Sequence, residues 1–329
     1  MKILVMGGSR FMGLATVREL LAHGHSVTVL NRGTRAVEWP GPVTELRGDR
    51  NDPQALRQLN GLAFDGVIDL SAYTGEQTRL LLAAPGMKDV PRWVHCSSGA
   101  VYAPQPILPW KENGAMGPWS LWGQYAIDKL DGERSLQTRR AANLATTALR
   151  LPFVLGPANY VDREEFVFNR LLDDATILLP GDGQAVVQFV STGQVAQAMV
   201  AALEVFSGSG WQVFNIAAPG FCSLEGFVQI CAEITGKEPK LQRVAGGPTG
   251  GAGEVFNGGN AVFPFPNANY VLDLEAAAAA GISPKPENLK DMLHQALSFL
   301  ESNPARRKWM RTPAELLHME TTHKFSIKE

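Results

Sequence analysis

Short, wholly apolar runs alternate with longer segments that carry apolar residues at helical spacing over the first two thirds of the chain. Apolar runs without polar alternation are typical of strands in a parallel sheet that is covered on both faces. The predicted strands cover residues 3–5, 26–30, 43–46, 64–70, 92–96, 186–190 and 213–216, with a further strand and loop at 149–157. Strands that alternate with helices predict an α/β fold, a Rossmann-type doubly wound parallel sheet, here with a smaller C-terminal lobe.

The first unit of this pattern runs strand, glycine turn, helix, strand over residues 1–32. Gly7 and Gly8 follow the first strand directly, Gly13 lies where the helix must pack close to that strand, and Gly24 ends the helix. Such a turn places free N–H groups and the positive end of the helix dipole where they favour an anion. We therefore expect a dinucleotide at this turn. The alternative is an ordinary strand-to-helix turn that needs small residues.

The end of the second predicted strand bears on the choice of cofactor. An acidic residue there binds the ribose 2′-hydroxyl of NAD, whereas this chain has Asn31 and Arg32, with Arg35 close behind. Guanidinium groups bind a phosphate in a bidentate fork. We therefore expect NADP(H) as the preferred cofactor and NAD(H) as the alternative. Arg10, which takes the place of the middle glycine of the turn, and Arg32 could instead be solvated or stack on the adenine.

Polar residues follow several predicted strands at their carboxyl ends, where open parallel sheets bind ligands. Asp49 follows the third strand and could accept a hydrogen bond from the adenine amine. It could also cap a helix, although Asp52 before a proline fits that role better. Residues 71–73 follow the fourth strand and residues 97–102 follow the fifth, so both segments are expected to line the site.

Tyr125 and Lys129 are four residues apart and share one face of a predicted helix. A tyrosine hydroxyl has a reference pKa near ~10, and lowering it by ~3 units requires about 4 kcal/mol of differential stabilisation. A lysine one turn along the helix and a positive nicotinamide ring could supply that stabilisation. Ser98 could hydrogen-bond the reacting oxygen and position it for proton transfer. The three residues together predict an acid–base site.

The composition limits the remaining possibilities. The chain has 329 residues, 45% of them hydrophobic and 19% charged, which is a normal balance for a globular protein of two domains. The formal net charge of −2 provides no basic field for nucleic acid or an anionic membrane. We expect neither a signal peptide, because a strand starts at residue 2, nor a membrane span. The three cysteines lack metal-ligand spacing, so a reduced, cytoplasmic protein without a metal in its site is expected.

Several segments carry a family resemblance, and they follow the family's order from end to end. They are GGSRFMG at 7–13, SSGAVY at 97–102, YAIDK at 125–129, LRLPFVLGP at 149–157, LPGDG at 179–183 and FPNANYVLDLEAAAAAGISPKP at 265–286. The chain thereby resembles the extended or atypical short-chain dehydrogenases/reductases of the NAD-dependent epimerase/dehydratase type. GGSRFMG, together with NRG and GDRNDP, is similar to a divergent branch that includes chloroplast stem-loop-binding proteins.

The resemblance implies a catalytic triad of Ser98, Tyr125 and Lys129. The implied cofactor contacts are Gly7, Gly8, Ser9, Arg10, Phe11, Met12, Gly13, Asn31, Arg32, Arg35, Asp49, Arg50, Ser71, Ala72, Tyr73, Ser97, Tyr125, Lys129, Pro152, Phe153 and Val154. The candidate substrate contacts are Tyr73, Ser98, Gly99, Trp119, Trp122, Asn159 and Arg163. A homodimer through the two long helices that flank the sheet is expected from the resemblance alone.

The chain also departs from the family pattern. The family's His-Val-Asp-Asp segment reads Ser-Thr-Gly-Gln at 191–194, and a tryptophan-rich loop replaces a more polar segment. These departures weaken the transfer of a sugar-nucleotide substrate and leave the triad intact. Trp110, Trp119 and Trp122 could form a wall over the nicotinamide, or could pack their loop onto the lobe. Arg163 could pair with an anionic substrate group, or be a solvated arginine at a helix start.

We expect two domains. The dinucleotide-binding domain is predicted at residues 1–155 and 183–218, and the substrate-binding lobe at 156–182 and 219–329. The glycine-rich segment 245–260 is expected to be a flexible loop, either a substrate lid or a disordered stretch. The short basic run at 306–311 is expected to be a solvated face.

Two classes of function follow, with a third as a variant. The first is an NAD(P)-dependent enzyme that acts on a hydroxyl or carbonyl carbon of a small molecule, such as a sugar nucleotide or a natural-product intermediate, with Tyr125 as acid or base. Epimerisation, oxidation, reduction, dehydration and decarboxylation all remain open. The second is a binding protein on the same fold, for RNA, and the third is a sensor of the cofactor. The net charge of −2 and the Ser-Tyr-Lys set count against a pure binder.

Overall fold

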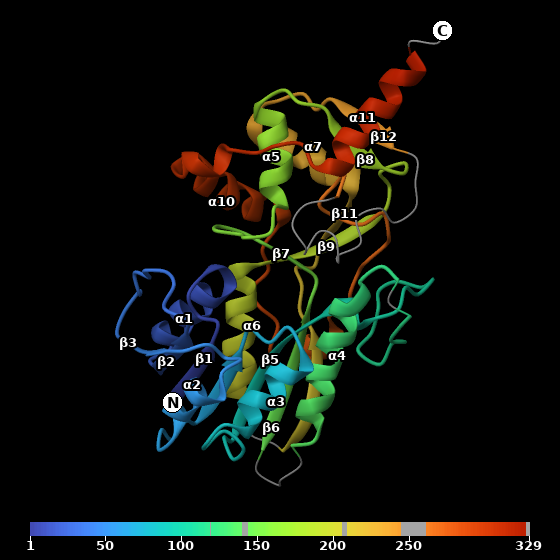
Figure 1. Ribbon diagram of the computed structural model, residues 1–329. Coiled ribbons are helices and arrows are strands. Elements are labelled where there is room, and N and C mark those ends of the chain that lie inside the picture. Colours follow the sequence, from blue (N-terminus) through green and yellow to red (C-terminus); the bar gives the residue numbers. More distant parts are fainter. Residues whose placement is uncertain (119, 140–143, 206–208, 245–260, 327–329) are drawn as a thin grey trace.

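A seven-stranded, wholly parallel sheet forms the larger part of the computed structural model, which describes residues 1–118, 120–139, 144–205, 209–244 and 261–326 (Figure 1). The strands are β1 (Lys2–Met6), β2 (Ser26–Asn31), β3 (Val43–Arg47), β4 (Gly66–Asp69), β5 (Arg92–Ser98), β6 (Ala145–Leu151) and β10 (Gly210–Asn215). Their order is β10-β6-β5-β4-β1-β2-β3. The chain runs outward from β1 to β3 and then returns to β4, so the direction of winding reverses between β1 and β4. Ligands bind at such a switch point.

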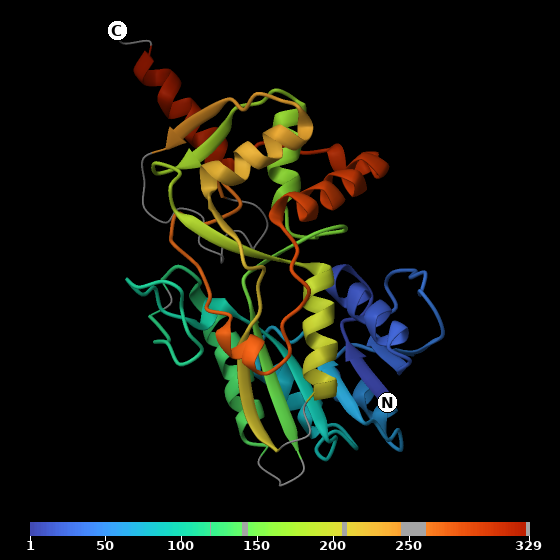
Figure 2. The same ribbon diagram turned by 180° about the vertical axis from the view of Figure 1, so that it is seen from behind.

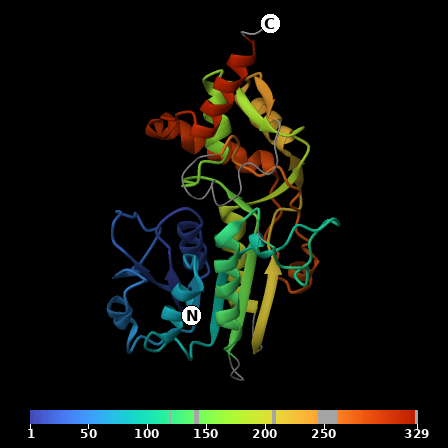
Figure 3. The same ribbon diagram turned by 45° about the vertical axis from the view of Figure 1, so that its right-hand side comes forward.

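Both faces of this sheet are covered, as the apolar strands require. Ile3 and Val5 of β1 pack in one core with α1 (Phe11–Ala22) and α6 (Thr192–Val205). Leu4 and Met6 point the other way, into a second core shared with α3 (Gly75–Ala83) and α4 (Gly123–Gln137). Figure 3 shows the helices on opposite sides of the sheet. The predicted doubly wound fold is thus confirmed.

The smaller lobe starts where Pro152 separates β6 from β7 (Phe153–Leu155). β7 pairs with β9 (Val186–Ser191), which pairs antiparallel with β11 (Phe221–Ser223), and β8 (Ile177–Pro180) pairs with β12 (Leu241–Val244). Against these strands lie α5 (Glu164–Leu172), α7 (Leu224–Thr235) and α10 (Leu289–Ser302) (Figure 2). The remaining helices are α2 (Pro53–Leu56), α9 (Glu275–Ala279) and α11 (Pro313–Ser326), the last of which projects from the lobe (Figure 1).

Several local predictions are confirmed. Gly24 has φ +75° just after α1, and Gly236 ends α7 in the left-handed region. The Asp52 side chain caps α2 by accepting from the backbone N–H of Gln54. The apolar stripe of α10 faces the core of the lobe. Among the described residues, no helix has the length and apolar character that a bilayer crossing needs.

Two expectations about elements are wrong. The fifth strand does not end at residue 96 but continues to Ser98, because Ser97 and Ser98 still pair with Arg150 and Leu151 of β6. The basic tail is not a solvated face either. Its arginines turn back onto α5 and the start of α11, where acidic residues face them: Arg306 binds Glu165, Arg307 binds Asp173 and Arg311 binds Glu315. The glycine-rich segment 245–260 lies outside the described residues.

Candidate functional site

A cavity of about 410 Å³ lies at the switch point, over the glycine turn between β1 and α1. Gly7 has φ +87°, which L side chains rarely adopt. A Cβ on Gly13 would come within 2.0 Å of the Gly7 carbonyl oxygen, so the helix can lie this close to the turn only with glycine there. The turn and the first N–H groups of α1 thus border an open space that suits a pyrophosphate. The residues present therefore fit a dinucleotide.

Most of the predicted cofactor contacts line this space, which we call the dinucleotide cavity. They are Gly7, Ser9, Arg10, Met12, Gly13, Asn31, Arg32, Arg35, Asp49, Arg50, Ser71 and Tyr73. The second glycine is different. A Cβ on Gly8 would meet Val17 and Val29 in the core, so its smallness serves the packing of α1 on β2, and Gly8 is not among the residues that line the cavity.

Arg50 borders the dinucleotide cavity, but its guanidinium is already engaged. It donates two hydrogen bonds to the carboxylate of Asp69, at 2.7 and 2.9 Å, and a third to the Ser71 hydroxyl at 2.7 Å. Burial opposes the charge on Asp69, but the neighbouring Arg50 outweighs it and holds the pKa of Asp69 below its usual value. This ion pair fixes the carboxyl end of β4 beside the cavity. Arg50 is consequently less suited to a phosphate than Arg32 or Arg35.

The predicted triad lines a second, narrower cavity of about 70 Å³, which we call the triad cavity. Ser98 ends β5 and Tyr125 and Lys129 lie on α4, so the sheet and one helix hold all three. The ammonium group of Lys129 donates to the carbonyl oxygens of Ala72 (2.8 Å) and Cys96 (2.9 Å). It lies 5.8 Å from the centre of the Tyr125 ring. The Ser98 hydroxyl accepts from the backbone N–H of Ala100 at 3.2 Å.

Lys129 keeps its positive charge although it is buried. Desolvation alone would lower its pKa, but Tyr125, Cys96 and Asp69 nearby raise it above the usual value. Two carbonyl oxygens also point at the ammonium group from both sides. A fixed, buried cation and the Tyr125 side chain therefore border the same cavity. Acid–base chemistry needs a proton-exchanging group of this kind within reach of the substrate.

The other predicted residues around the triad cavity have distinct places. Phe11, Pro152, Phe153 and Val154 line it, and so do Ser97, Trp122 and Arg163. Ala72 contributes its carbonyl oxygen to Lys129. Gly99 lies below the surface, where a Cβ would meet the Tyr270 hydroxyl at 1.8 Å, so this position serves packing. Asn159 is buried, and its amide donates to Glu164 at 2.9 Å.

The tryptophans were expected either to form a wall over the nicotinamide or to pack their loop onto the lobe, and the two described ones differ in this respect. Trp122 packs against Tyr270 and Phe153 and still borders the triad cavity. Trp110 is buried in the lobe core against Tyr102 and Tyr270, as packing of the loop predicts. Trp119 lies outside the described residues. Arg163 is only 5% exposed, so the solvated alternative is wrong for it; it donates to the Val154 carbonyl oxygen, and its guanidinium carbon lies 5.5 Å from the centre of the Phe153 ring.

A third cavity of about 990 Å³, the lobe cavity, opens on the other side of Tyr73 and Tyr125. Its walls are the start of α4, the 159–169 segment, residues 261–264 and the basic tail from Arg306 to Pro313. The lobe and the sheet therefore enclose it together. A small molecule bound there would reach the triad.

The comparisons with known proteins agree with this geometry. The model of the NAD dependent epimerase/dehydratase family matches residues 3–217. The chain belongs to this family. It is 30% identical over 293 residues to the chloroplast stem-loop binding protein of 41 kDa b of Arabidopsis thaliana, covering 84% of this chain and 73% of that protein. It is 27% identical over 271 residues to the UDP-glucose 4-epimerase of Corynebacterium glutamicum, covering 72% and 81%.

Solved structures of the epimerase/dehydratase type share the fold. MoeE5 in complex with UDP-glucose and NAD superimposes with a TM-score of 0.73 at 22% identity, over 92% of this chain and 100% of that chain. A likeness at this identity bears on the fold alone.

One candidate site residue of this epimerase/dehydratase-family chain, Tyr160, is not indicated by any motif in the sequence. Tyr160 borders the dinucleotide, triad and lobe cavities alike. Its hydroxyl lies 2.8 Å from the Tyr73 hydroxyl, and the guanidinium carbon of Arg10 lies 3.8 Å from the centre of its ring. We call Arg10, Tyr73 and Tyr160 the tyrosine latch. No sequence signal points to it, because Tyr160 is 150 residues from Arg10 and has no motif of its own.

A second missed feature lies beneath the triad. Arg150 on β6 and Glu133 on α4 form a fully buried ion pair, with two hydrogen bonds of 2.9 and 2.7 Å. Glu133 also accepts a hydrogen bond from the Ser97 hydroxyl, and Arg150 donates to the Tyr102 hydroxyl. The network ties α4, which carries Tyr125, to the end of β5, which carries Ser98.

Proposed function

We propose that this chain is an NAD(P)-dependent enzyme that oxidises or reduces a hydroxyl or carbonyl carbon of a small molecule, with epimerisation as one outcome. The observation that carries the proposal is the placement of Ser98, Tyr125 and Lys129 around one cavity. That cavity adjoins the dinucleotide cavity through Met12, Leu70, Tyr73 and Tyr160, which line both. A cofactor that spans both would bring its reactive ring to the triad.

Each of the three residues has a task in this proposal. A nicotinamide held there would supply the acceptor or donor of a hydride for the substrate carbon. Tyr125 exchanges the proton of the substrate hydroxyl, and Lys129 holds a fixed positive charge 5.8 Å from the centre of the Tyr125 ring. Ser98 donates a hydrogen bond to the substrate oxygen and holds it within reach of Tyr125.

For the cofactor we propose a preference for NADP(H). The observation that supports this preference is the end of β2, where Asn31 stands in place of an acid. The Asn31 side-chain oxygen accepts a hydrogen bond from the backbone N–H of Gly33. Arg32 and Arg35 line the same end of the cavity and can pair with a 2′-phosphate. NAD(H) is the alternative, since the family is NAD-dependent and MoeE5 is solved with NAD.

The lobe cavity is the proposed place of the substrate, with Tyr73, Trp122, Asn159 and Arg163 as contacts at its boundary with the triad. In this division residues 1–155 and 183–218 hold the cofactor, apart from β7 and β9, which pair within the lobe, and 156–182 and 219–329 shape the substrate site. The named relatives include a UDP-glucose 4-epimerase, so a sugar nucleotide is one candidate, and a natural-product intermediate is the other.

The test is turnover by purified protein against a panel of UDP-sugars and small hydroxy or keto compounds with each cofactor. A substrate that turns over in the native protein and fails in the Tyr125→Phe variant, with cofactor binding unchanged, supports the proposal. The second candidate function is RNA binding, which the stem-loop-binding relative favours. Stem-loop RNA that binds without any turnover of the panel would favour it instead.

A further inference from the structure

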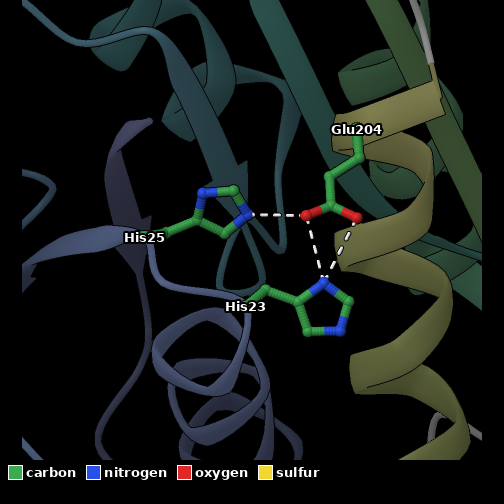
Figure 4. A group of neighbouring side chains, drawn as sticks. All are labelled: His23, His25 and Glu204. Atoms are coloured by element: carbon green, nitrogen blue, oxygen red, sulfur yellow. Dashed lines mark hydrogen bonds and ion pairs between the residues drawn. The ribbon is translucent and has the colours of Figure 1, made fainter.

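Two histidines and a glutamate lie together at the end of the large sheet where β2 starts, opposite the dinucleotide cavity. His23 follows α1, His25 precedes β2, and Glu204 lies in the last turn of α6 (Figure 4). The carboxylate of Glu204 lies between the two rings: Oε1 is 3.1 Å from Nδ1 of His23 and 2.8 Å from Nε2 of His25. Within the described part of the chain, this is the one group of three such side chains with ligand atoms inside 4.8 Å of one another.

We propose that His23, His25 and Glu204 bind a divalent transition-metal ion, Zn²⁺ in the first place. Two imidazole nitrogens and one carboxylate oxygen are ligands that Zn²⁺ takes in proteins, with a water molecule in the fourth position. Ligand atoms of a tetrahedral zinc ion at ~2.05 Å lie about 3.4 Å from one another. The two distances to Glu204 are already near this value, so only the two rings need to adjust.

The outer surroundings of the site differ between the two histidines. A ligating histidine usually donates its second ring N–H to a carboxylate, a carbonyl or water, which fixes the ring and its proton. Nε2 of His23 lies 3.4 Å from Glu19, which can accept such a bond. Nδ1 of His25 lies 3.3 Å from the terminal ammonium group of Met1, which can only donate, so this group has to move aside when Nε2 of His25 binds the ion. Any proton on Nδ1 of His23 or Nε2 of His25 is released when the ion binds.

The backbone holds the two histidines in place before any ion arrives. His23 and His25 donate their backbone N–H groups to carbonyls of the last turn of α1, and Gly24 between them takes φ +75°. His25 is only 9% exposed, so its ring is fixed, while Glu204 reaches it from the neighbouring helix. A bound ion would therefore join α1 to α6. Since β2 starts here and reaches the dinucleotide cavity only at its other end, the site is separate from the triad.

Calorimetric titration of the untagged, chelator-treated full chain with ZnCl₂ tests this proposal. We expect one ion per chain in the native protein and a loss of at least 10-fold in affinity in Glu204→Gln and His23→Gln. Both residues are partly exposed, so neither change removes core packing. His294→Gln, which removes an exposed histidine on α10, is the matched control and should bind like the native protein. Co²⁺ should give the intense visible bands of a tetrahedral site in the native protein and in His294→Gln, and not in Glu204→Gln or His23→Gln.

A thermal measurement gives an independent readout. Zinc at about 100-fold above the native dissociation constant should raise Tm by about 4 °C in the native protein and in His294→Gln, and by about 2 °C or less in Glu204→Gln. Cofactor binding should be the same in all four proteins. Absence of zinc binding by the native protein, or equal binding by native and Glu204→Gln proteins, would overturn the proposal. Since the site is distinct from the triad, neither result depends on the proposed enzyme activity.

Discussion

The tyrosine latch should control the entry of the cofactor. An extended dinucleotide has to reach from the glycine turn to the triad, and Tyr73 and Tyr160 border both cavities along that route. In the structure Tyr160 is held by the Tyr73 hydroxyl and by the stacked guanidinium of Arg10. Arg10 also borders the place of the pyrophosphate, so phosphate and ring compete for it. We therefore expect that Tyr160 must turn away before the cofactor can bind.

The contacts set the size of the effect. The Arg10 stack contributes about 0.5–1 kcal/mol at a partly exposed site, and the hydrogen bond between the hydroxyls about 0.5–1 kcal/mol. The edge contact of Tyr160 with Phe11, at 5.8 Å between ring centres, adds about 0.5 kcal/mol. Together they favour the closed form by about 1.5–2.5 kcal/mol, which leaves the open form at about one part in 10 to 70.

Tyr160→Ala should therefore raise the association rate of NADPH by about 10- to 70-fold. Tyr160→Phe keeps the stack and loses only the hydroxyl pair, so a rise of about 2- to 5-fold is expected. The assay is stopped-flow fluorescence of NADPH binding, with Phe221→Ala as a control that removes an exposed aromatic ring elsewhere. An association rate that is unchanged or slower in Tyr160→Ala would refute the latch.

Three further outcomes are expected. Tyr125→Phe should lower kcat by about 10²- to 10⁴-fold with the cofactor Kd unchanged, and equal turnover would remove Tyr125 as the acid–base group. Arg150→Met leaves Glu133 buried without its partner and should lower the free energy of unfolding in urea by about 3–5 kcal/mol; a smaller loss than 1 kcal/mol would contradict this. Burial and the neighbouring Lys129 lower the pKa of His95 to about 3. The unfolded chain thus binds a proton between pH 6.5 and 3 that the folded chain does not. The free energy of unfolding should therefore decrease as the pH is lowered through this window. His95→Leu should remove up to about 5 kcal/mol of that fall, and parallel unfolding curves for the two proteins would contradict it.

The fold was predictable because its signals are local. Apolar strands, the glycine turn and the caps at Asp52 and Gly236 depend on neighbours a few residues away, and they lie where they were expected apart from the end of the fifth strand. The triad follows the same logic. Tyr125 and Lys129 share a helical face, and Ser98 ends the adjacent strand.

Contacts between distant segments were not predictable in this way. A run of arginines such as 306–311 is usually solvated, and only the fold brings Glu165, Asp173 and Glu315 to face it. Arg50 has the charge that a phosphate contact needs, but the facing carboxylate of Asp69 engages it. In the latch, Tyr73 contacts Tyr160, which is 87 positions away in the sequence. In the histidine group, Glu204 contacts His23 from 181 positions away. A single sequence without relatives carries no sign of such pairs.

The central claim is that the glycine turn and the triad serve one nicotinamide cofactor. Its most direct test is calorimetry of the purified native protein with NADP(H) and NAD(H), repeated with Arg32→Ala. We expect one cofactor per chain, tighter binding of NADPH than of NADH, and a loss of NADPH affinity of about 10-fold in Arg32→Ala with NADH unchanged. Tighter binding of NADH would overturn the preference for NADP(H), and no binding of either cofactor would contradict the account as a whole.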